Sequence, residues 1–121
     1  MSDSNLVKQL AMNVQTWSGL LQHGVTEQTE LRLDFAYEAP TRAAADKLIA
    51  LLRHETDYDL SEPRSSGSFF SRQFTVSGTT QQAKITLDTL NQWVDWMVAA
   101  GQQSGGCTFD GWGAQVPAKT H

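Results

Sequence analysis

The strictest pattern in this chain is the alternation of apolar and polar residues from Glu30 to Glu38. Every second position is apolar, and these positions hold Leu31, Leu33, Phe35 and Tyr37. Because successive side chains in a strand point to opposite faces, the alternation predicts a half-buried strand with one apolar and one polar face. The chain must therefore build a sheet that packs a second layer against one face, as antiparallel sheets commonly do.

Three segments with helical spacing surround this strand. The first runs from about Ser4 to His23, and its apolar stripe consists of Leu6, Leu10, Val14, Trp17 and Leu21. The second begins at Pro40-Thr41 and ends near His54, and the third runs from about Thr80 to Ala100. Apolar residues three and four positions apart line one side of a helix, so each segment is predicted to be an amphipathic helix.

Three further strands are predicted, at Tyr58–Leu60, Ser68–Val76 and Cys107–Val116, with a loop over 62–67 and a turn over 77–80. The order is then helix, followed by strand–helix–strand–strand–helix–strand. This order predicts an α+β fold, a ferredoxin-like two-layer sandwich (βαββαβ) with an extra N-terminal helix. The first and third strands are expected in the centre and the last strand at an edge beside the first. With 121 residues, the whole chain is expected to form a single domain.

The last predicted strand contains the run Phe109-Asp110-Gly111-Trp112-Gly113. In a regular strand Phe109 and Trp112 would point to opposite faces, whereas a bulge at Gly111 would bring both to one face. Trp112 then either anchors the core or presents a large aromatic side chain to a partner. Asp110 is expected to bond local amides in a turn.

This aromatic-Asp-Gly-Trp-Gly run near the end of a short chain resembles the regulator of ribonuclease activity B family, whose members are protein inhibitors of ribonuclease E. The order of elements from about residue 5 to residue 117 resembles that family as well. The resemblance implies a non-enzymatic regulator that binds ribonuclease E, in its arginine-rich non-catalytic region, and reduces its action on RNA. The best-known members of the family have clusters of acidic residues in the first helix. This chain departs from that pattern, because its first helix holds almost no acidic residue after Asp3.

Composition narrows the function classes. Nine basic and 13 acidic residues give a net charge of −4, which argues against a dedicated nucleic-acid binder. The single Cys107 excludes an internal disulfide, suits a reducing compartment, and is expected to be a small buried hydrophobe. No apolar run is long enough to span a membrane, and the N-terminus lacks the apolar segment of a secretory signal. A cytoplasmic protein with no membrane or direct nucleic-acid contact is expected.

Seven residues are candidate partner-binding residues. Asp34 and Glu38 lie on the polar face of the first strand, and Asp57 and Asp59 belong to the acidic run 55–62. That run is either a docking patch for basic segments or a solvated helix end. Trp96 falls opposite the apolar stripe of the third helix together with Ile85, so it is either an exposed contact residue or covered by the first helix through Trp17 and Leu21. Asp110 and Trp112 complete the set.

Residue types for catalysis or metal binding do not gather in the sequence. His23, His54 and His121 lack the spacing of a zinc site, and the glycines form no phosphate loop. Neither a cofactor nor a metal is expected. The sequence therefore predicts a non-enzymatic regulator with a protein partner, as a monomer or weak homodimer. Two alternatives are an immunity-type or assembly protein on the same fold, and a small-ligand binder or enzyme that uses the carboxylates of Asp34 and Asp110.

Overall fold

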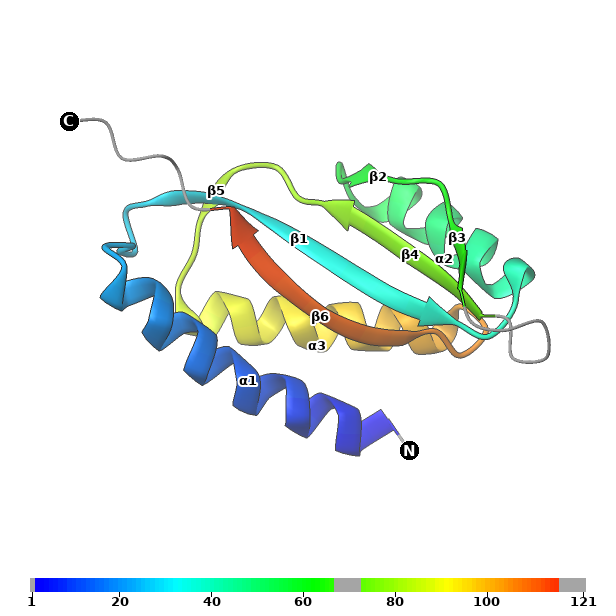
Figure 1. The fold of residues 1–121 in the computed structure, drawn as a ribbon, viewed down its shortest axis with the longest axis horizontal. Helices are drawn as coiled ribbons and strands as arrows, with labels where there is room; N and C mark the ends of the chain where they lie inside the picture. Colours follow the sequence, from blue (N-terminus) through cyan, green and yellow to red (C-terminus); the bar gives the residue numbers. More distant parts are fainter. Residues whose placement is uncertain (1, 67–72, 116–121) are drawn as a thin grey trace.

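A computed structural model describes residues 2–66 and 73–115, which form three helices and an open antiparallel sheet (Figure 1). The α+β class is therefore confirmed. The helices are α1 (Ser2–Gln22), α2 (Arg42–Glu55) and α3 (Leu87–Gln103). The strands are β1 (Glu30–Ala39), β2 (Asp59–Leu60), β3 (Arg64–Ser66), β4 (Gln73–Thr79), β5 (Ala83–Lys84) and β6 (Thr108–Gln115).

Strand β1 is the centre of the sheet. Asp34 pairs with Thr79 of β4 and also with Gly113 of β6, so these two strands lie on opposite sides of β1. Strands β2 and β3 both pair with β4, and β5 pairs with the first two residues of β1. The predicted positions of the first strand in the centre and of the last strand beside it are confirmed.

The two faces of the sheet differ as the alternation in β1 predicts. The apolar residues of β1 are all at most 5% exposed, and they face α2 and α3: Leu31, Leu33, Phe35, Tyr37 and Ala39. The intervening residues from Arg32 to Glu38 are half-buried or exposed. In Figure 1 the strands pass in front of α2 and α3, so the viewer looks onto the open, polar face.

The core consists of two clusters. The larger lies between the sheet, α2 and α3, and its largest member is Tyr37, which is 0% exposed. The Tyr37 hydroxyl donates to the carbonyl of Met97 at 2.7 Å, and burial raises the pKa of this tyrosine strongly. The smaller cluster joins α1 to the beginning of β1 and α3, and contains Trp17, Val25, Leu31, Leu33, Ile85 and Leu90.

Helix α3 begins at Leu87, and the predicted start near Thr80 is wrong. Thr86 caps this helix, because its hydroxyl accepts from the N–H of Thr89 at 3.1 Å and its own N–H donates to the Thr89 hydroxyl at 2.8 Å. The preceding residues return to the sheet as β5. Ile85 is consequently buried in the smaller cluster (8% exposed), which corrects its expected place on the exposed side of the helix.

Two other element predictions also change. Residues 64–66 form β3 instead of a loop, and residues 77–79 continue β4 instead of forming a turn. The predicted strand Ser68–Val76 is confirmed only over 73–76, since 68–72 lie outside the described residues. None of the helices in the described ranges combines the length and apolar character needed to span a bilayer.

Helix α1 docks on a different side from the one that its apolar stripe predicts. Val14 and Leu21 are 54% and 47% exposed, while the polar residues Gln9 and Asn13 are 3% and 0% exposed. Trp17 is buried, and Leu6 and Leu10 are half-buried. The helix is therefore rotated so that polar side chains, and only three of the five stripe residues, face the protein.

Candidate functional site

Of the two geometries that the sequence allows for strand β6, regular or bulged, the structure contains the bulge. Ala36 of β1 pairs with Gly111, and the next residue, Tyr37, pairs with Phe109, so Asp110 is an extra residue in β6. Gly111 has φ +148°, a conformation that favours glycine. The bulge brings Phe109 and Trp112 to the helix-covered side of the sheet, as expected, and Phe109 is only 1% exposed there.

Trp112 lies between β6 and the helices. Its ring packs edge-on against Trp93, with ring centres 6.4 Å apart, and its indole N–H donates to Oδ1 of Asn13 at 2.7 Å. Asn13 in turn donates to Asn91 of α3 at 3.0 Å. Trp112 is half-buried and contacts both core clusters. This geometry favours a packing role for Trp112 over a role in presenting an aromatic to a partner.

Polar side chains of α1 also bind the backbone at the bulge. Asn5 and Gln9 each donate to the carbonyl of Phe109 at 3.3 Å, and Gln9 also lies 3.5 Å from the carbonyl of Asp110. A bulge interrupts the regular pairing of a strand, and these amides bind carbonyl groups at that interruption. The bulge therefore explains why α1 buries Gln9 where an apolar residue is expected.

The open face of the sheet brings together four predicted residues that are far apart in the sequence. Asp34 and Asp59 both pair with Thr79 of β4, from opposite sides of that strand. Glu38 lies on the same face of β1 as Asp34, and alternation after Phe109 places the exposed Asp110 on this face as well. The floor between these carboxylates is made of small residues: Ala36, Thr75, Ser77, Thr79, Gly111 and Gly113.

Hydrogen bonds orient two of these carboxylates. Oδ1 of Asp34 accepts from the hydroxyl of Thr79 at 2.9 Å and from the amide of Gln115 at 2.8 Å. Glu38 accepts from the Thr75 hydroxyl at 3.3 Å. These donors are neutral, so both carboxylates keep their charge available to an incoming cation.

Charges on the open face are unequal. Asp59 pairs with Arg32 at 2.8 Å, and Arg64 pairs in register with Thr75 and so belongs to the same face. Among the described residues, the recorded ion pairs do not include Asp34, Glu38 or Asp110. In the described part of this face, the four carboxylates of Asp34, Glu38, Asp59 and Asp110 outnumber the two arginines, and this excess of negative charge attracts cations.

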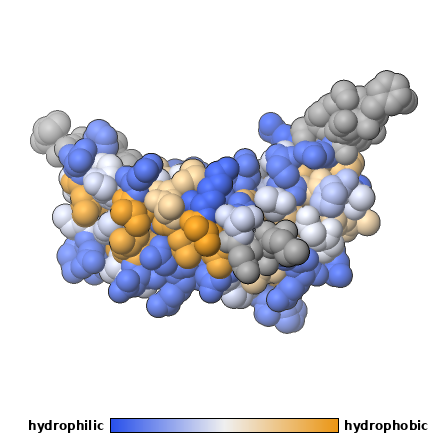
Figure 2. Space-filling model, turned by 90° about the horizontal axis from the view of Figure 1, so that it is seen from below, coloured by the Kyte–Doolittle hydropathy of each residue, from blue (hydrophilic) through white to orange (hydrophobic). Residues whose placement is uncertain are grey.

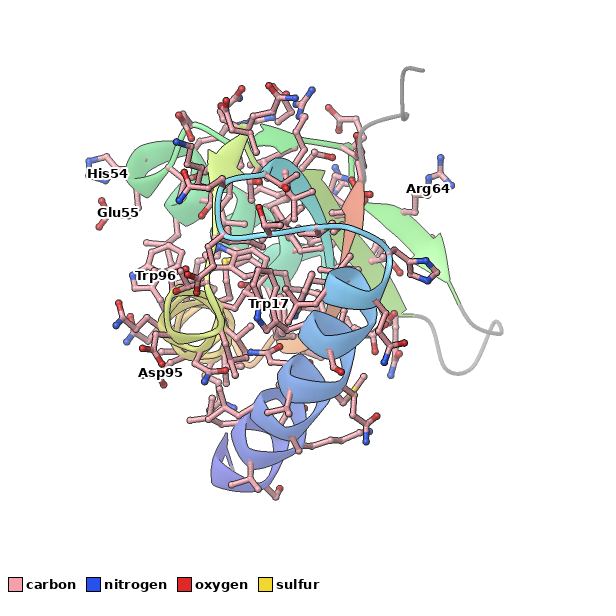
Figure 3. All side chains as sticks on the ribbon, turned by 90° about the vertical axis from the view of Figure 1, so that its left-hand side faces the viewer. Trp17, His54, Glu55, Arg64, Asp95 and Trp96 are labelled. Atoms are coloured by element: carbon pink, nitrogen blue, oxygen red, sulfur yellow. The ribbon has the colours of Figure 1, made fainter. Side chains whose placement is uncertain are left out.

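Trp96 and Asp57 lie away from the open face. Trp96 is 40% exposed and lines a hollow of about 360 Å³ with Glu55, Tyr58 and Trp93. The expectation that α1 covers Trp96 is wrong, because Leu21 is itself exposed and Trp17 lies on the other side of α3 (Figure 3). The structure therefore places four of the seven predicted residues on the open face. The other three lie elsewhere: Trp96 is exposed on α3, Trp112 is half-buried between β6 and the helices, and Asp57 lines a separate pocket.

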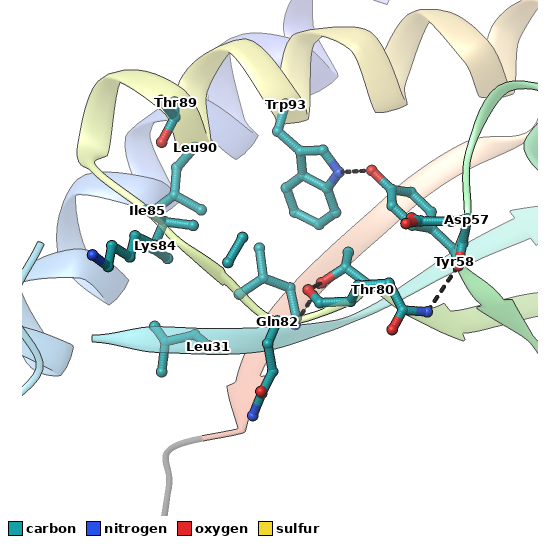
Figure 4. Close-up of a pocket in the computed structure, with 13 residues that line it drawn as sticks. Leu31, Asp57, Tyr58, Thr80, Gln82, Lys84, Ile85, Thr89, Leu90 and Trp93 are labelled. Atoms are coloured by element: carbon teal, nitrogen blue, oxygen red, sulfur yellow. Dashed lines mark hydrogen bonds between the residues drawn. The ribbon is translucent and has the colours of Figure 1, made fainter. Parts of the chain in front are cut away.

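Asp57 lies at the rim of a pocket of about 390 Å³ that the sequence does not predict (Figure 4). The apolar lining of this pocket includes Leu31, Ile85, Leu90 and Trp93, and its polar lining includes Thr80, Gln82 and Lys84. The indole N–H of Trp93 donates to the hydroxyl of Tyr58 at 2.9 Å, and burial raises the pKa of Tyr58. The pocket exists because 80–85 run beside β1 before α3 begins, which the helical pattern in the sequence conceals.

The chemistry of titratable groups is limited in the part of the chain that the structure describes. Within these residues, no group of three or more His, Cys, Asp or Glu side chains is arranged to hold a metal ion. Cys107 is 1% exposed, as expected, with its Sγ 3.5 Å from the carbonyl oxygen of Ser104. Burial raises the pKa of this thiol, which disfavours the reactive thiolate.

We expect iodoacetamide to alkylate Cys107 at least about 100-fold more slowly in the folded protein than in denaturant, because reaction requires an opening of the core and a thiolate. Mass spectrometry of quenched samples measures both rates, and the denatured protein is the control. Equal rates would contradict the buried position of Cys107.

Comparisons with known proteins leave the family open. No protein-family model matches the chain, and no curated protein matches it. A function for this chain is therefore argued from the arrangement of its side chains and from the resemblance of residues Phe109 to Gly113.

Proposed function

We propose that this chain is a non-enzymatic regulator that binds a protein partner, and that the open face of the sheet docks a cationic segment of that partner. The observation that carries the proposal is the gathering of Asp34, Glu38, Asp59 and Asp110 over a floor of small side chains. Such a floor lets an extended chain lie close to the sheet. Complementary charge steers association and selects the partner.

The strand order supports a ferredoxin-like arrangement for this regulator. Taking β2 and β3 together as the second strand, the order across the sheet is β6, β1, β4 and then β2/β3, with α2 after β1 and α3 after β4. This order supports a βαββαβ arrangement to which α1 and the short strand β5 are additional. Helices α2 and α3 both cover the apolar face of the sheet, which leaves the open face for binding.

The first partner to test is ribonuclease E, in the cytoplasm. The resemblance of Phe109 to Gly113 to the ribonuclease E inhibitors motivates this choice, and the arginine-rich region implied by that resemblance matches the negative charge of the open face. Binding there would regulate RNA processing or decay without direct contact between this chain and nucleic acid. An immunity-type or assembly role would use the same face with an unrelated protein.

The decisive variant removes charge and keeps shape. We expect Asp34→Asn/Glu38→Gln to bind the partner about 5- to 30-fold more weakly, because each exposed ion pair contributes about 0.5–1 kcal/mol. Glu27→Gln/Asp95→Asn is the matched control, since it removes two exposed carboxylates outside this face. Affinity capture from cytoplasmic extract identifies the partner, and calorimetry at two salt concentrations measures both variants.

Each outcome has a distinct meaning. Capture of ribonuclease E, weakened by the open-face variant but not by the control, supports both the surface and the target. Capture of another protein with the same variant pattern keeps the surface and discards ribonuclease E. Equal binding by both variants, with loss of binding in Trp96→Ala, would move the contact surface to α3 and overturn the proposed face.

A further inference from the structure

The outer flank of α1 carries an exposed apolar stripe that the fold does not use. Val7, Val14 and Leu21 are 65%, 54% and 47% exposed. They recur every seven residues, so they lie on one line along the helix. Helix α1 runs along the lower side of Figure 1, and Figure 2, which views the molecule from below, shows apolar residues across the middle of this face. The stripe therefore extends along much of the 21-residue helix.

This exposure follows from the way α1 docks. Asn5, Gln9 and Asn13 are four residues apart and make the hydrogen bonds to β6 and α3, so they determine which side of the helix faces inward. The apolar stripe is consequently turned outward. A fold that buries amides and exposes aliphatic side chains on the same helix keeps an apolar surface available for another molecule.

The low charge of α1 indicates which kind of molecule binds this apolar surface. The whole of α1 contains two charged residues, Asp3 and Lys8, which cancel, whereas the chain has a net charge of −4. Two copies that meet through α1 therefore avoid bringing like charges together. Depletion of charge at an apolar patch is typical of interface cores and especially of homodimers. The acidic open faces would lie away from such an interface.

We propose that the stripe Val7, Val14 and Leu21 binds the same stripe of a second copy, with the two α1 helices antiparallel. The small residues Ala11 and Ser18 lie between the large ones on the same side of the helix. When Ala11 faces Val14 of the second copy, Val7 faces Ser18 of that copy, so each large side chain meets a small one. Two-fold symmetry repeats both contacts.

A charge on the stripe tests the dimer. Val14→Glu is expected to weaken self-association at least about tenfold, because a carboxylate would lose water at an apolar contact. Gln15→Glu is the matched control, since it adds the same charge at an exposed position about 100° around the helix. Sedimentation equilibrium from micromolar to submillimolar concentration measures the dissociation constant, and circular dichroism verifies that both variants fold.

Two results would overturn the proposal. A wild-type protein that stays monomeric over the whole range excludes this dimer, and if Val14→Glu then loses a captured partner, the stripe belongs to that partner. Equal effects of Val14→Glu and Gln15→Glu on a real dimer would place its interface elsewhere.

Cross-linking tests the antiparallel register. In Val7→Cys/Ser18→Cys, residue 7 of one copy is expected to form a disulfide with residue 18 of the other under mild oxidation. The two positions are about 16 Å apart in one helix, so a disulfide within the chain is excluded. The single variants Val7→Cys and Ser18→Cys are the controls, and native Cys107 is buried. Equally fast cross-linking by either single variant would contradict the register.

Discussion

Trp112→Ala is expected to lower the free energy of unfolding by about 2–4 kcal/mol, since it removes a half-buried ring and breaks a buried hydrogen bond. The ring packs against Trp93, and its N–H is bound by Asn13, which is fully buried. Without Trp112, Oδ1 of Asn13 loses its donor inside the protein. Chemical denaturation measures the change, and loss of α1 docking should accompany it.

Trp112→Phe separates the ring from its hydrogen bond. It keeps most of the apolar contact, so its cost is expected to be about 1–2 kcal/mol, the penalty for an unsatisfied buried acceptor. A different result would contradict the packing role. If Trp112→Ala unfolds like the wild type but no longer binds its partner, Trp112 is a contact residue. The packing role argued from its geometry would then be wrong.

Gly101→Ala is expected to lower the free energy of unfolding by about 1–3 kcal/mol, although alanine is the better helix former. A Cβ at Gly101 would lie 2.6 Å from the carbonyl oxygen of Cys107 and 2.7 Å from Cε2 of Tyr37. The carbonyl belongs to the backbone, and the Tyr37 ring is fixed by its bond to Met97. Neither neighbour can move without disturbing the core.

Gly19→Ala is the matched control, and it should have the opposite sign. Gly19 lies inside α1 and a Cβ there meets nothing within 4 Å, so the substitution is expected to stabilise the protein by about 0.5–1 kcal/mol. Denaturant midpoints of the two variants give both signs in one experiment. Stabilisation by Gly101→Ala would show that α3 does not approach Cys107 and Tyr37 as closely as these distances indicate.

Much of the fold follows from local patterns in the sequence. Alternation in Leu31 to Tyr37 predicts the strand and its buried face, and Thr41 predicts the start of α2, where its hydroxyl accepts from the N–H of Ala44 at 3.0 Å. Gly111 indicates where a bulge in β6 could lie, and the register of β6 on β1 shifts next to it. Each of these features depends on neighbours in the chain, so the sequence displays it directly.

The start of α3 shows where such patterns fail. Residues 80–86 are predicted to begin the third helix, yet pairing of Ala83 with Leu31 draws them to the sheet, and the Thr86–Thr89 capping box then begins the helix later. Pairing with a strand about 50 residues away cannot be read from helical spacing. The pocket beside Trp93 depends on the same pairing, so helical spacing does not reveal it either.

The sequence by itself determined the class of the fold and the polar and apolar faces of β1, whereas it allowed either a regular strand or a bulge at Gly111, and the structure contains the bulge. Tertiary structure decided the rotation of α1, because the amides of Gln9 and Asn13 satisfy carbonyl and indole groups that come together only after β6 and α3 have packed. It thereby decided that Trp112 is half-buried against the helices and that Val14 is exposed. Hydrophobic periodicity indicates how much apolar surface a helix has. Which part of that surface is buried depends on polar groups, distant in the sequence, that need hydrogen-bond partners.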